Sequence, residues 1–514
     1  MSKTIIIIGA GLAGLSAALQ AAENGCNVKL VSSLPSERAQ SVMAEGGINA
    51  ALNTKDENDS PEEHFTDTIK AACGLADPNA VWGMTQAAPE LVHWLLKLGV
   101  KFNMSGYDDV DLRNFGGQKK KRTAFAQSDT GKQIMTAMID AVRRKEASGM
   151  VERFSHHSFL TLRLCGNICC GCVIRDEYSQ ETVELPGDAV IVATGGMHGL
   201  FGNTTGSLSN TGEVTAELFR LGVPLANGEM IQYHPTTVKY GGKRMLISEA
   251  ARGEGGRLFA MKDGKQWYFM EEKYPELGNL MPRDITAREI WKVSHESEVF
   301  LDMTEISEEI ISNKLSGLAD DCMTYLHKDI RKEPVSVLPG IHYFMGGILV
   351  DEQHRTPIQN LYAAGECCAQ YHGANRLGGN SLLGALYGGR VAAKSACEQA
   401  DVVDLSCATQ IDFPPASQIS EIKQLNKVMQ ETMGVVRNEN TLLNGIQTVQ
   451  ALTGNLPLLG MAVLKSALAR KESRGAHWRE DYPKSNDDDY LKTTVARFDG
   501  KQIQISFVPV PERR

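Results

Sequence analysis

The sequence predicts an α/β protein in which a Rossmann-like domain is split by an inserted α+β capping domain and followed by a C-terminal helical domain. Three features lead to this prediction. A short apolar strand at residues 5–8 runs directly into a glycine-rich turn and a helix. Strand-like runs recur at residues 183–192 and 361–366, separated by a long stretch with few apolar runs. Residues 418–477 carry helical periodicity instead. We therefore expect a Rossmann-like domain in two parts (1–225 and 349–405), a capping domain (226–348), and a C-terminal helical domain with its tail (406–514).

The composition is typical of a water-soluble enzyme. The 514 residues carry a net charge of -9, which argues against a nucleic-acid-binding or anionic-membrane-binding surface. The only long apolar run, residues 5–22, contains three glycines, so we expect no direct membrane insertion and a cytoplasmic location, with membrane contact only through a partner subunit. The eleven cysteines lack the spacing of zinc or iron–sulfur sites. We expect reduced thiols and no metal.

The first glycine pattern predicts dinucleotide binding. Gly9-Ala10-Gly11-Leu12-Ala13-Gly14 lies between the apolar strand and the helix, where glycines allow a tight turn and close approach to a pyrophosphate. The second strand ends at Ser32 and Ser33, where an acidic residue usually contacts the adenosine ribose. Serine can still form that hydrogen bond, although without charge.

Two later glycine elements favour FAD over NAD. Gly46 and Gly47 follow Ser41 in a setting of small residues, which suits a backbone packed against a flat ring. Ala193-Thr194-Gly195 follows the strand-like run that ends at residue 192. Two such elements far apart in one chain suit an FAD enzyme better than a compact NAD dehydrogenase.

Polar groups accumulate between residues 225 and 376. Glu249 and Arg252 lie three positions apart and share a face if that segment is helical. Arg376 lies among glycines before a predicted helix, which is typical of an anion site. The anion is a cofactor phosphate, a flavin oxygen or a substrate carboxylate. Together with His234, Arg283 and His342, these groups form a set suited to a small dianion.

The motifs occur in one order along nearly the whole chain, to about Pro483: Gly9-x-Gly11-x-x-Gly14, Glu45-Gly46-Gly47, Phe115-Gly-Gly-Gln118, His234-Pro-Thr236, Glu249-x-x-Arg252-Gly-Glu-Gly-Gly256, Arg283-Asp284, His342-Tyr-x-Met-Gly-Gly347 and His372-Gly-Ala-Asn-Arg376. That series resembles the flavoprotein subunit of the succinate dehydrogenase and fumarate reductase family, which also includes L-aspartate oxidase.

The resemblance implies a role for each group. Arg376 and His342 would hold one substrate carboxylate, and His234 and Ser248 the other, while Phe115 would cover the substrate. Reduced flavin would deliver hydride to fumarate, Arg283 would supply the proton, and Glu249 and Arg252 would relay protons to it. The cofactor-binding residues would be Gly9, Ala10, Gly11, Leu12, Ala13, Gly14, Ser32, Ser33, Ser41, Gly46, Gly47, Ala193, Thr194, Gly195, Glu213, Glu366, Asn380, Ser381, Leu382 and Leu383.

Three departures from the family pattern refine these expectations. Membrane-bound members attach FAD through a histidine that aligns with Gln40, so we expect noncovalent FAD, a lowered flavin potential and a preference for fumarate reduction. L-aspartate oxidases carry a glutamate at the position of Phe115, and the apolar side chain favours an unaminated C4-dicarboxylate. The family's Thr-Gly-Asp-Gly occurs as Thr211-Gly-Glu213-Val, which weakens the cofactor contact of Glu213.

Three alternative functions remain to be compared. L-aspartate oxidase, which converts L-aspartate to iminoaspartate, is the nearest enzyme alternative. A flavin-binding RNA-modifying factor would share only the first glycine motif and would need a basic face. A noncatalytic electron-transfer subunit would not need Arg283, Glu249 and Arg252. Because the chain itself lacks iron–sulfur spacing, electrons must come from an iron–sulfur or other electron-transfer partner subunit or from a diffusible carrier.

Overall fold

The computed structural model describes residues 2–106, 109–401, 411, 413 and 418–514. At its centre lies a parallel five-stranded sheet. In spatial order its strands are β20 (Leu361–Ala363), β10 (Ala189–Val192), β1 (Thr4–Ile8), β2 (Asn27–Ser32) and β6 (Val151–Ser155). The two predicted parts of the Rossmann-like domain thus meet in one sheet, because β20 pairs with β10 across the whole inserted region. The predicted fold class is confirmed.

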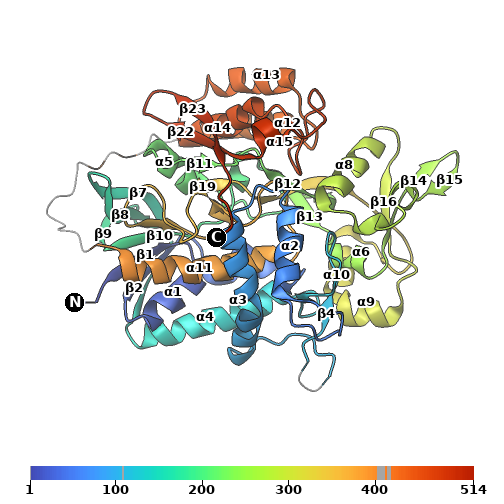
Figure 1. Ribbon diagram of the computed structural model, residues 1–514, viewed down its shortest axis with the longest axis horizontal. Helices are drawn as coiled ribbons and strands as arrows, with labels where there is room; N and C mark the ends of the chain where they lie inside the picture. The colour runs from blue at the N-terminus through green and yellow to red at the C-terminus, as the bar shows by residue number, and fades with distance from the viewer. Residues whose placement is uncertain (1, 107–108, 402–410, 412, 414–417) are drawn as a thin grey trace.

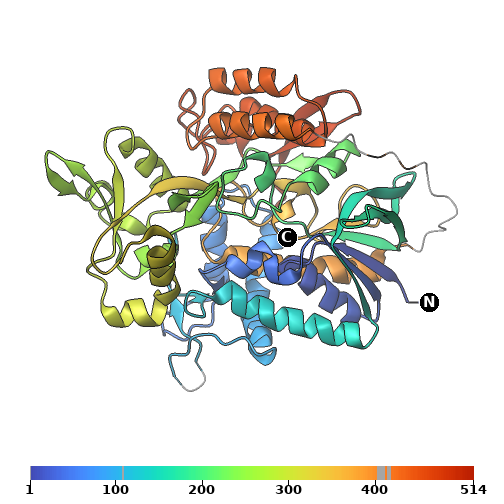
Figure 2. The same ribbon diagram turned by 180° about the vertical axis from the view of Figure 1, so that it is seen from behind.

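The strand β1 shows why this sheet forms the core. Ile5 and Ile7 face a helical layer, while Ile6 and Ile8 face a layer of strands, and all four side chains are buried. A strand buried on both faces needs the continuous apolar run that the sequence has. The helical layer contains α1 (Leu12–Glu23), α3 (Pro78–Lys97), α4 (Thr130–Ala147) and α11 (Asn380–Gln399), with α2 (Pro61–Ala71) packed on α3. The two helices α1 and α11 lie side by side beneath the sheet (Figures 1 and 2).

A three-stranded meander covers the opposite face of the central sheet. It consists of β7 (His157–Cys165), β8 (Ile168–Asp176) and β9 (Thr182–Pro186). The predicted strand at residues 183–192 is therefore wrong as one element, because Pro186 and Gly187 end β9 before β10 begins in a different sheet. A small three-stranded sheet contains β3 (Ile48–Asn49), β4 (Leu112–Arg113) and β5 (Thr123–Ala124).

The inserted region has two antiparallel sheets with helices around them, as expected for an α+β unit (Figure 1). One sheet contains β12 (Ile231–Tyr240), β13 (Lys243–Leu246) and β18 (Leu338–Phe344). The other contains β14 (Arg257–Lys262), β15 (Lys265–Trp267), β16 (Val299–Asp302) and β17 (Val335–Ser336). The helices are α6 (Glu249–Gly253), α7 (Phe269–Lys273), α8 (Arg283–Val293), α9 (Glu308–Lys314) and α10 (Ser316–Asp321).

The C-terminal region contains α12 (Ile419–Thr432), α13 (Glu439–Val449) and α14 (Asn455–Ala469), followed by α15 (Asp487–Tyr490). It also contains a hairpin of β22 (Lys492–Phe498) and β23 (Ile503–Pro509), which the sequence analysis missed. The hairpin extends a sheet with β11 (Leu225–Ala226), β19 (Gly347–Leu349) and β21 (Cys368–Ala369), and α5 (Glu213–Arg220) packs nearby. The expected helix through His477 is wrong beyond Ala469.

A buried ionic network replaces that helical continuation. Arg470 pairs with Glu229 and Glu472 at 2.7 Å each, and Arg474 pairs with Glu472 at 2.8 Å. Carbonyl oxygens of Tyr490 and Lys492 accept further hydrogen bonds from Arg470. These charges join the C-terminal region to the segment just before β12.

The boundary expected between residues 405 and 406 lies outside the described residues, so the division into domains stays a prediction. Within the described chain, no helix is long and apolar enough to cross a membrane. Nine described cysteines are free thiols, but Cys165 is disulfide-bonded, so the expectation of reduced thiols is wrong there.

Candidate active site

The N-terminal glycine turn packs tightly on one side and leaves room on the other. Gly9 has φ +110°, and a Cβ there would lie 2.2 Å from the Ala193 carbonyl oxygen. A Cβ on Gly14 would lie 1.8 Å from the Gly9 carbonyl oxygen, whereas one on Gly11 would meet no described atom closer than 3.6 Å. Gly9 and Gly14 thus allow strand, turn and helix to touch. Gly11 keeps open the N-terminus of α1, where free N–H groups suit a phosphate.

Several predicted cofactor residues surround this turn. The Leu12 N–H donates to the Ser41 hydroxyl at 3.3 Å, so the segment that contains Ser41 lies against the start of α1. At the end of β2, the Ser32 hydroxyl is buried and has no hydrogen-bond partner among the described residues. Such an orphaned hydroxyl fits a ligand hydroxyl such as that of a ribose. Ser33 is exposed, and so is Glu213, whose charged neighbours are Arg175 and Glu177.

A second helix terminus lies at the predicted flavin end of the site. Gly379 precedes α11 with φ +84°, and within the described chain no side chain caps this helix. The Asn380 side chain is fully engaged, because it bonds to Asn49 and His64 through Oδ1 and to Thr68 through Nδ2. Asn380 therefore positions the helix, and the first-turn N–H groups of Ser381, Leu382 and Leu383 are the ones available to a ligand.

The paired glycines pack closely against Phe115 and β5. A Cβ on Gly46 would lie 2.9 Å from the Phe115 ring, and a Cβ on Gly47 would lie 2.5 Å from the Ala124 carbonyl oxygen. The Arg113 guanidinium donates to the carbonyl oxygens of Glu45 and Gly46. Side chains at these two positions would therefore clash with Phe115 and Ala124.

Glu249 connects the other two predicted catalytic residues, Arg283 and Arg252. Its Oε2 accepts a hydrogen bond from Arg283 Nε at 2.7 Å, and its Oε1 lies 3.4 Å from the Arg252 guanidinium. The Gly116 N–H also donates to Oε1 at 3.0 Å. Burial alone would raise the pKa of Glu249, but the two guanidinium groups and these hydrogen bonds lower it overall. The three predicted catalytic residues thus form one buried, ionised chain, and α6 holds Glu249 and Arg252 on one face as expected.

Gln232 is a site residue that the sequence analysis did not assign. Its Oε1 accepts from Arg283 Nη1 at 3.0 Å, and its Nε2 donates to the Asn375 side chain and to the Arg376 carbonyl oxygen. Gln232 is fully buried and fixes the distance between the two arginines. Its position in β12, two residues before His234, is the sequence signal for it, because alternate residues of a strand share a face.

Two neutral histidines lie close together beside the Arg283–Glu249–Arg252 chain of charges. The rings of His234 on β12 and His342 on β18 lie 5.1 Å apart between centroids. Burial lowers the pKa of both well below the ordinary value, and nearby Arg283 and Arg376 lower it further. Each neutral ring therefore has a single N–H, and in His234 the Nδ1 atom also lies 3.1 Å from the Thr236 carbonyl oxygen.

Arg376 is a buried cation that forms no ion pair with any described residue, although the Glu366 and Glu249 carboxylates act on it electrostatically. Its Nε has no hydrogen-bond partner in the described part of the chain, and its guanidinium lies 4.3 Å from the centre of the Tyr343 ring. Burial lowers the pKa of Arg376 to about 9, and the positive charge of Arg283 contributes. A desolvated guanidinium without a counter-ion is costly, so this position strongly favours a bound anion.

Glu45 is a second group that the sequence analysis left unassigned. Burial raises its pKa to about 8, the Asp321 carboxylate adds to the rise, and a hydrogen bond with Ser248 opposes it. The residue is half-buried, but its Oε2 is covered and lacks a hydrogen-bond partner among the described atoms. Glu45 is thus a protonated acid at neutral pH, next to Gly46 and the predicted substrate ligand Ser248.

We expect Glu45→Gln to flatten the dependence of stability on pH. The folded protein holds a proton on Glu45 between its ordinary pKa of 4.5 and about 8, and the unfolded chain releases it. Raising the pH through this window therefore favours unfolding, by up to about 1.4 kcal/mol per pH unit. Urea unfolding of the FAD-loaded protein at pH 6 and pH 8 should show a smaller loss of stability for Glu45→Gln than for the unmodified protein. Equal losses would contradict the assignment.

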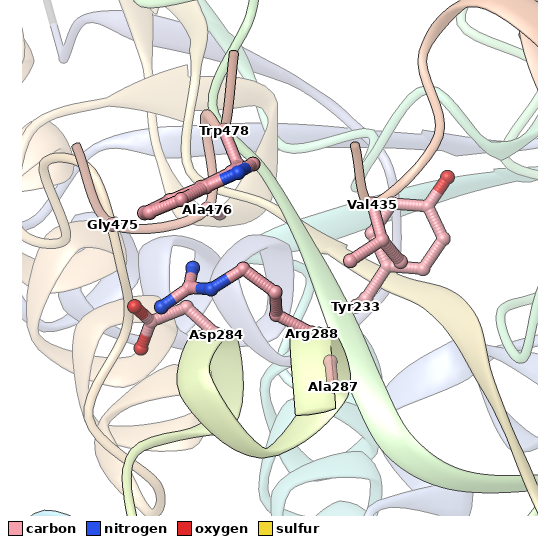
Figure 3. A pocket seen from close by; sticks show the side chains of 8 residues that line it. All are labelled: Tyr233, Asp284, Ala287, Arg288, Val435, Gly475, Ala476 and Trp478. Carbon is pink, nitrogen blue, oxygen red and sulfur yellow. The ribbon is translucent and has the colours of Figure 1, made fainter. Parts of the chain in front are cut away.

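Helix α8 begins at Arg283, and later residues of the helix contact other parts of the protein (Figure 3). Arg288 lies 4.0 Å from the centre of the Trp478 ring of the C-terminal region, and both residues line a cavity of about 10 Å³. On the same helix, the Asp284 carboxylate accepts a hydrogen bond from Asn375 at 3.1 Å. The helix thus contacts both the C-terminal region and the segment of Arg376.

The fold and site define an FAD-dependent oxidoreductase. The FAD binding domain family matches residues 4–382, and the family described as "Fumarate reductase flavoprotein C-term" matches residues 452–513. The free helix N-termini, the Ser32 hydroxyl and the glycine surfaces fit a dinucleotide with a flat ring. FAD as cofactor is thus confirmed at the level of the family.

Relatives then place the chain more narrowly. It is 38% identical to the succinate dehydrogenase flavoprotein subunit of Bacillus subtilis, over 100% of this chain and 98% of the relative. It is 32% identical to the 8-methylmenaquinol:fumarate reductase flavoprotein subunit of Wolinella succinogenes, over 100% and 92%. A solved structure of an E. coli quinol fumarate reductase FrdA variant superposes with a TM-score of 0.90 at 27% identity, over 99% and 97%. The chain belongs to the succinate dehydrogenase and fumarate reductase flavoprotein family, as the resemblance predicted.

Proposed function

We propose that this protein interconverts fumarate and succinate, and that its main activity is fumarate reduction. The observation that carries the proposal is the unpaired, buried guanidinium of Arg376 beside the ionised Arg283–Glu249–Arg252 chain. A dianionic substrate would supply the missing counter-charge, and the Arg283–Glu249–Arg252 chain of charges would supply a proton. L-aspartate oxidase is not favoured, because Phe115 offers no charge to a substrate amine.

Substrate binding in this proposal uses the groups around Arg376. Arg376 and the N–H of His342 hold one carboxylate, and the N–H of His234 and the Ser248 hydroxyl hold the other. Phe115, 2% exposed, covers the substrate and excludes water. The Arg376 guanidinium at one end, and N–H or hydroxyl donors at both ends, orient the double bond and stabilise the negative charge that develops on a carboxylate during reduction.

Proton supply falls to Arg283. FAD, when bound and reduced, supplies the hydride to one alkene carbon, and Arg283 gives a proton to the other. A guanidinium is a very weak acid, with a pKa above about 12. The transfer therefore needs immediate replacement of the proton, which the Glu249 carboxylate, 2.7 Å from Arg283, would pass on after receiving it from solvent by way of Arg252. Fumarate thereby gains one hydride and one proton and becomes succinate.

The direction of the reaction is inferred from Gln40, which begins a short 3-10 turn at Gln40–Met43. Glutamine cannot form the covalent flavin bond of a histidine, so we expect FAD to be released into the supernatant when the holoprotein is precipitated with acid. Yellow colour that stays with the polypeptide would contradict noncovalent binding. Without the covalent bond the flavin potential is lower, which favours fumarate reduction.

The electron source is a further part of the proposal. We place the protein in the cytoplasm, at a membrane only through an iron–sulfur or other electron-transfer partner subunit. Two of its relatives are flavoprotein subunits by name, which supports a multisubunit enzyme.

A direct comparison of substrates tests the proposed function. The FAD-loaded protein should oxidise reduced viologen dye when fumarate is added, and should oxidise succinate more slowly with a dye acceptor. L-aspartate should give no iminoaspartate or hydrogen peroxide. Aspartate turnover without fumarate reduction would replace the proposal with the oxidase alternative.

A further inference from the structure

Two adjacent threonines each contact one histidine of the active-site region. Thr205 Oγ1 lies 2.8 Å from Nδ1 of His342, and Thr204 Oγ1 lies 3.0 Å from Nδ1 of His198. His342 is the proposed ligand of a substrate carboxylate, and His198 lies beside the proposed cofactor residue Glu366. One short loop thus contacts both sides of the site.

We propose that Thr205 is a positioning residue that fixes the tautomer of His342, with its hydroxyl donating to Nδ1 so that Nε2 carries the proton. The inference rests on the proposed function, because it concerns how His342 binds a carboxylate. A neutral imidazole has one N–H, and only the nitrogen that carries it can donate to a carboxylate. His342 is neutral because burial and the nearby cations disfavour a second proton.

The alternative tautomer would need a poorer arrangement of hydrogen bonds. If Nδ1 carried the proton, it would donate to Thr205, and the Thr205 hydroxyl would have to donate to the Ile341 carbonyl oxygen at 3.4 Å. That distance is long for an O–H···O bond, which is usually about 2.7–2.8 Å. The 2.8 Å contact with Nδ1 is the better use of the single hydroxyl proton.

The neighbouring pair provides an internal precedent. The Thr204 hydroxyl accepts from the Gly206 N–H at 3.2 Å, which leaves its own proton for Nδ1 of His198. With Nδ1 as acceptor, Nε2 of a neutral His198 carries the proton, and it lies 3.7 Å from the Glu366 carboxylate without a hydrogen-bond partner among the described residues. In His198 the same arrangement therefore presents an N–H to a carboxylate of the protein itself. In His342 it would present an N–H to a carboxylate of the substrate.

Thr205→Val tests the role of the hydroxyl, with Thr205→Ser as the matched control. Valine keeps the shape and the backbone bond of residue 205 to Ile341. We expect the KM for fumarate to rise about tenfold in Thr205→Val, the effect of about one hydrogen bond, with a smaller change in kcat. Thr205→Ser should stay near the unmodified enzyme. A KM within twofold of that enzyme in Thr205→Val would overturn the inference.

A second measurement reads the tautomer without relying on activity. In the FAD-loaded protein with ¹⁵N-labelled histidine, the His342 signals, assigned with His342→Gln, should report Nε2–H, and Thr205→Val should shift them toward Nδ1–H. An Nδ1–H form in the unmodified protein would overturn the inference even if His342 binds substrate. If His342→Gln leaves the KM unchanged while the Nε2–H form is observed, the proposed function fails and the tautomer assignment stands.

Discussion

Replacement of Arg283 by alanine is expected to lower fumarate reduction at least about a thousandfold while FAD stays bound. General acid catalysis contributes about 10² to 10⁴ in rate, and Arg283 is the group that we assign as the proton donor. Arg283 contacts Glu249 and Gln232 but none of the proposed cofactor residues. Fumarate-dependent oxidation of reduced viologen measures the rate, and the flavin absorbance per protein measures FAD content.

The control for this experiment is an arginine of the same inserted region that lies outside the site. Arg331 forms ion pairs with Glu308 and Asp329 at the surface, so Arg331→Ala should keep both activity and FAD. We expect Arg283→Ala to fold, because Glu249 still pairs with Arg252 and still accepts a hydrogen bond from the Gly116 N–H. Activity within tenfold of the unmodified enzyme would exclude Arg283 as the proton donor.

The sequence was most informative where local physics and fold agree. The apolar run Ile5–Ile8 is typical of a strand that is buried on both faces. Gly9 and Gly14 lie where a Cβ would clash with a backbone carbonyl oxygen. Strand, turn and helix therefore follow from the types of these residues. The same holds for Glu249 and Arg252, whose spacing places them on one face of α6 and lets them pair. These elements depend on residues close together in the chain.

Two parts of the C-terminal region differ from the helical prediction. Residues 503–507 alternate apolar and polar side chains shortly after Asp499 and Gly500, which is a hairpin signal that helical periodicity upstream obscured. Residues 470–474 look helical, but their charges pair with Glu229 and with each other in a buried network. Long-range ion pairs of this kind are not visible in local sequence.

The roles of Arg376, Gln232 and Glu45 depend on tertiary structure. From sequence, Arg376 suited a phosphate, a flavin oxygen or a substrate carboxylate equally well. Its position beside Arg283, with Gln232 between the two, favours a substrate carboxylate. Glu45 looked like part of a glycine turn, and only burial near Asp321 reveals a pKa of about 8.

Arg376→Met is expected to weaken substrate binding and at the same time to stabilise the substrate-free protein. A buried guanidinium without a counter-ion opposes folding, and its pKa of about 9 instead of 12.5 reflects that cost. Methionine removes the charge and fills much of the same space. After allowing for the lost contact with Tyr343, about 1–3 kcal/mol of added stability is expected. The KM for fumarate should rise at least about a hundredfold, because the proposed substrate carboxylate loses its buried cation.

Arg122→Met is the matched control, because Arg122 is an equally buried arginine that does have partners. It is 0% exposed and pairs with Asp59 and Asp67 at 2.9 Å each. Its removal leaves two carboxylates uncompensated and should destabilise the protein by about 3–5 kcal/mol. Urea unfolding of both FAD-loaded variants without substrate should therefore shift in opposite directions. A loss of stability in Arg376→Met comparable to that in Arg122→Met would mean that Arg376 already has a counter-charge within the holoprotein, and the anion that it holds would then be part of the cofactor and not the substrate.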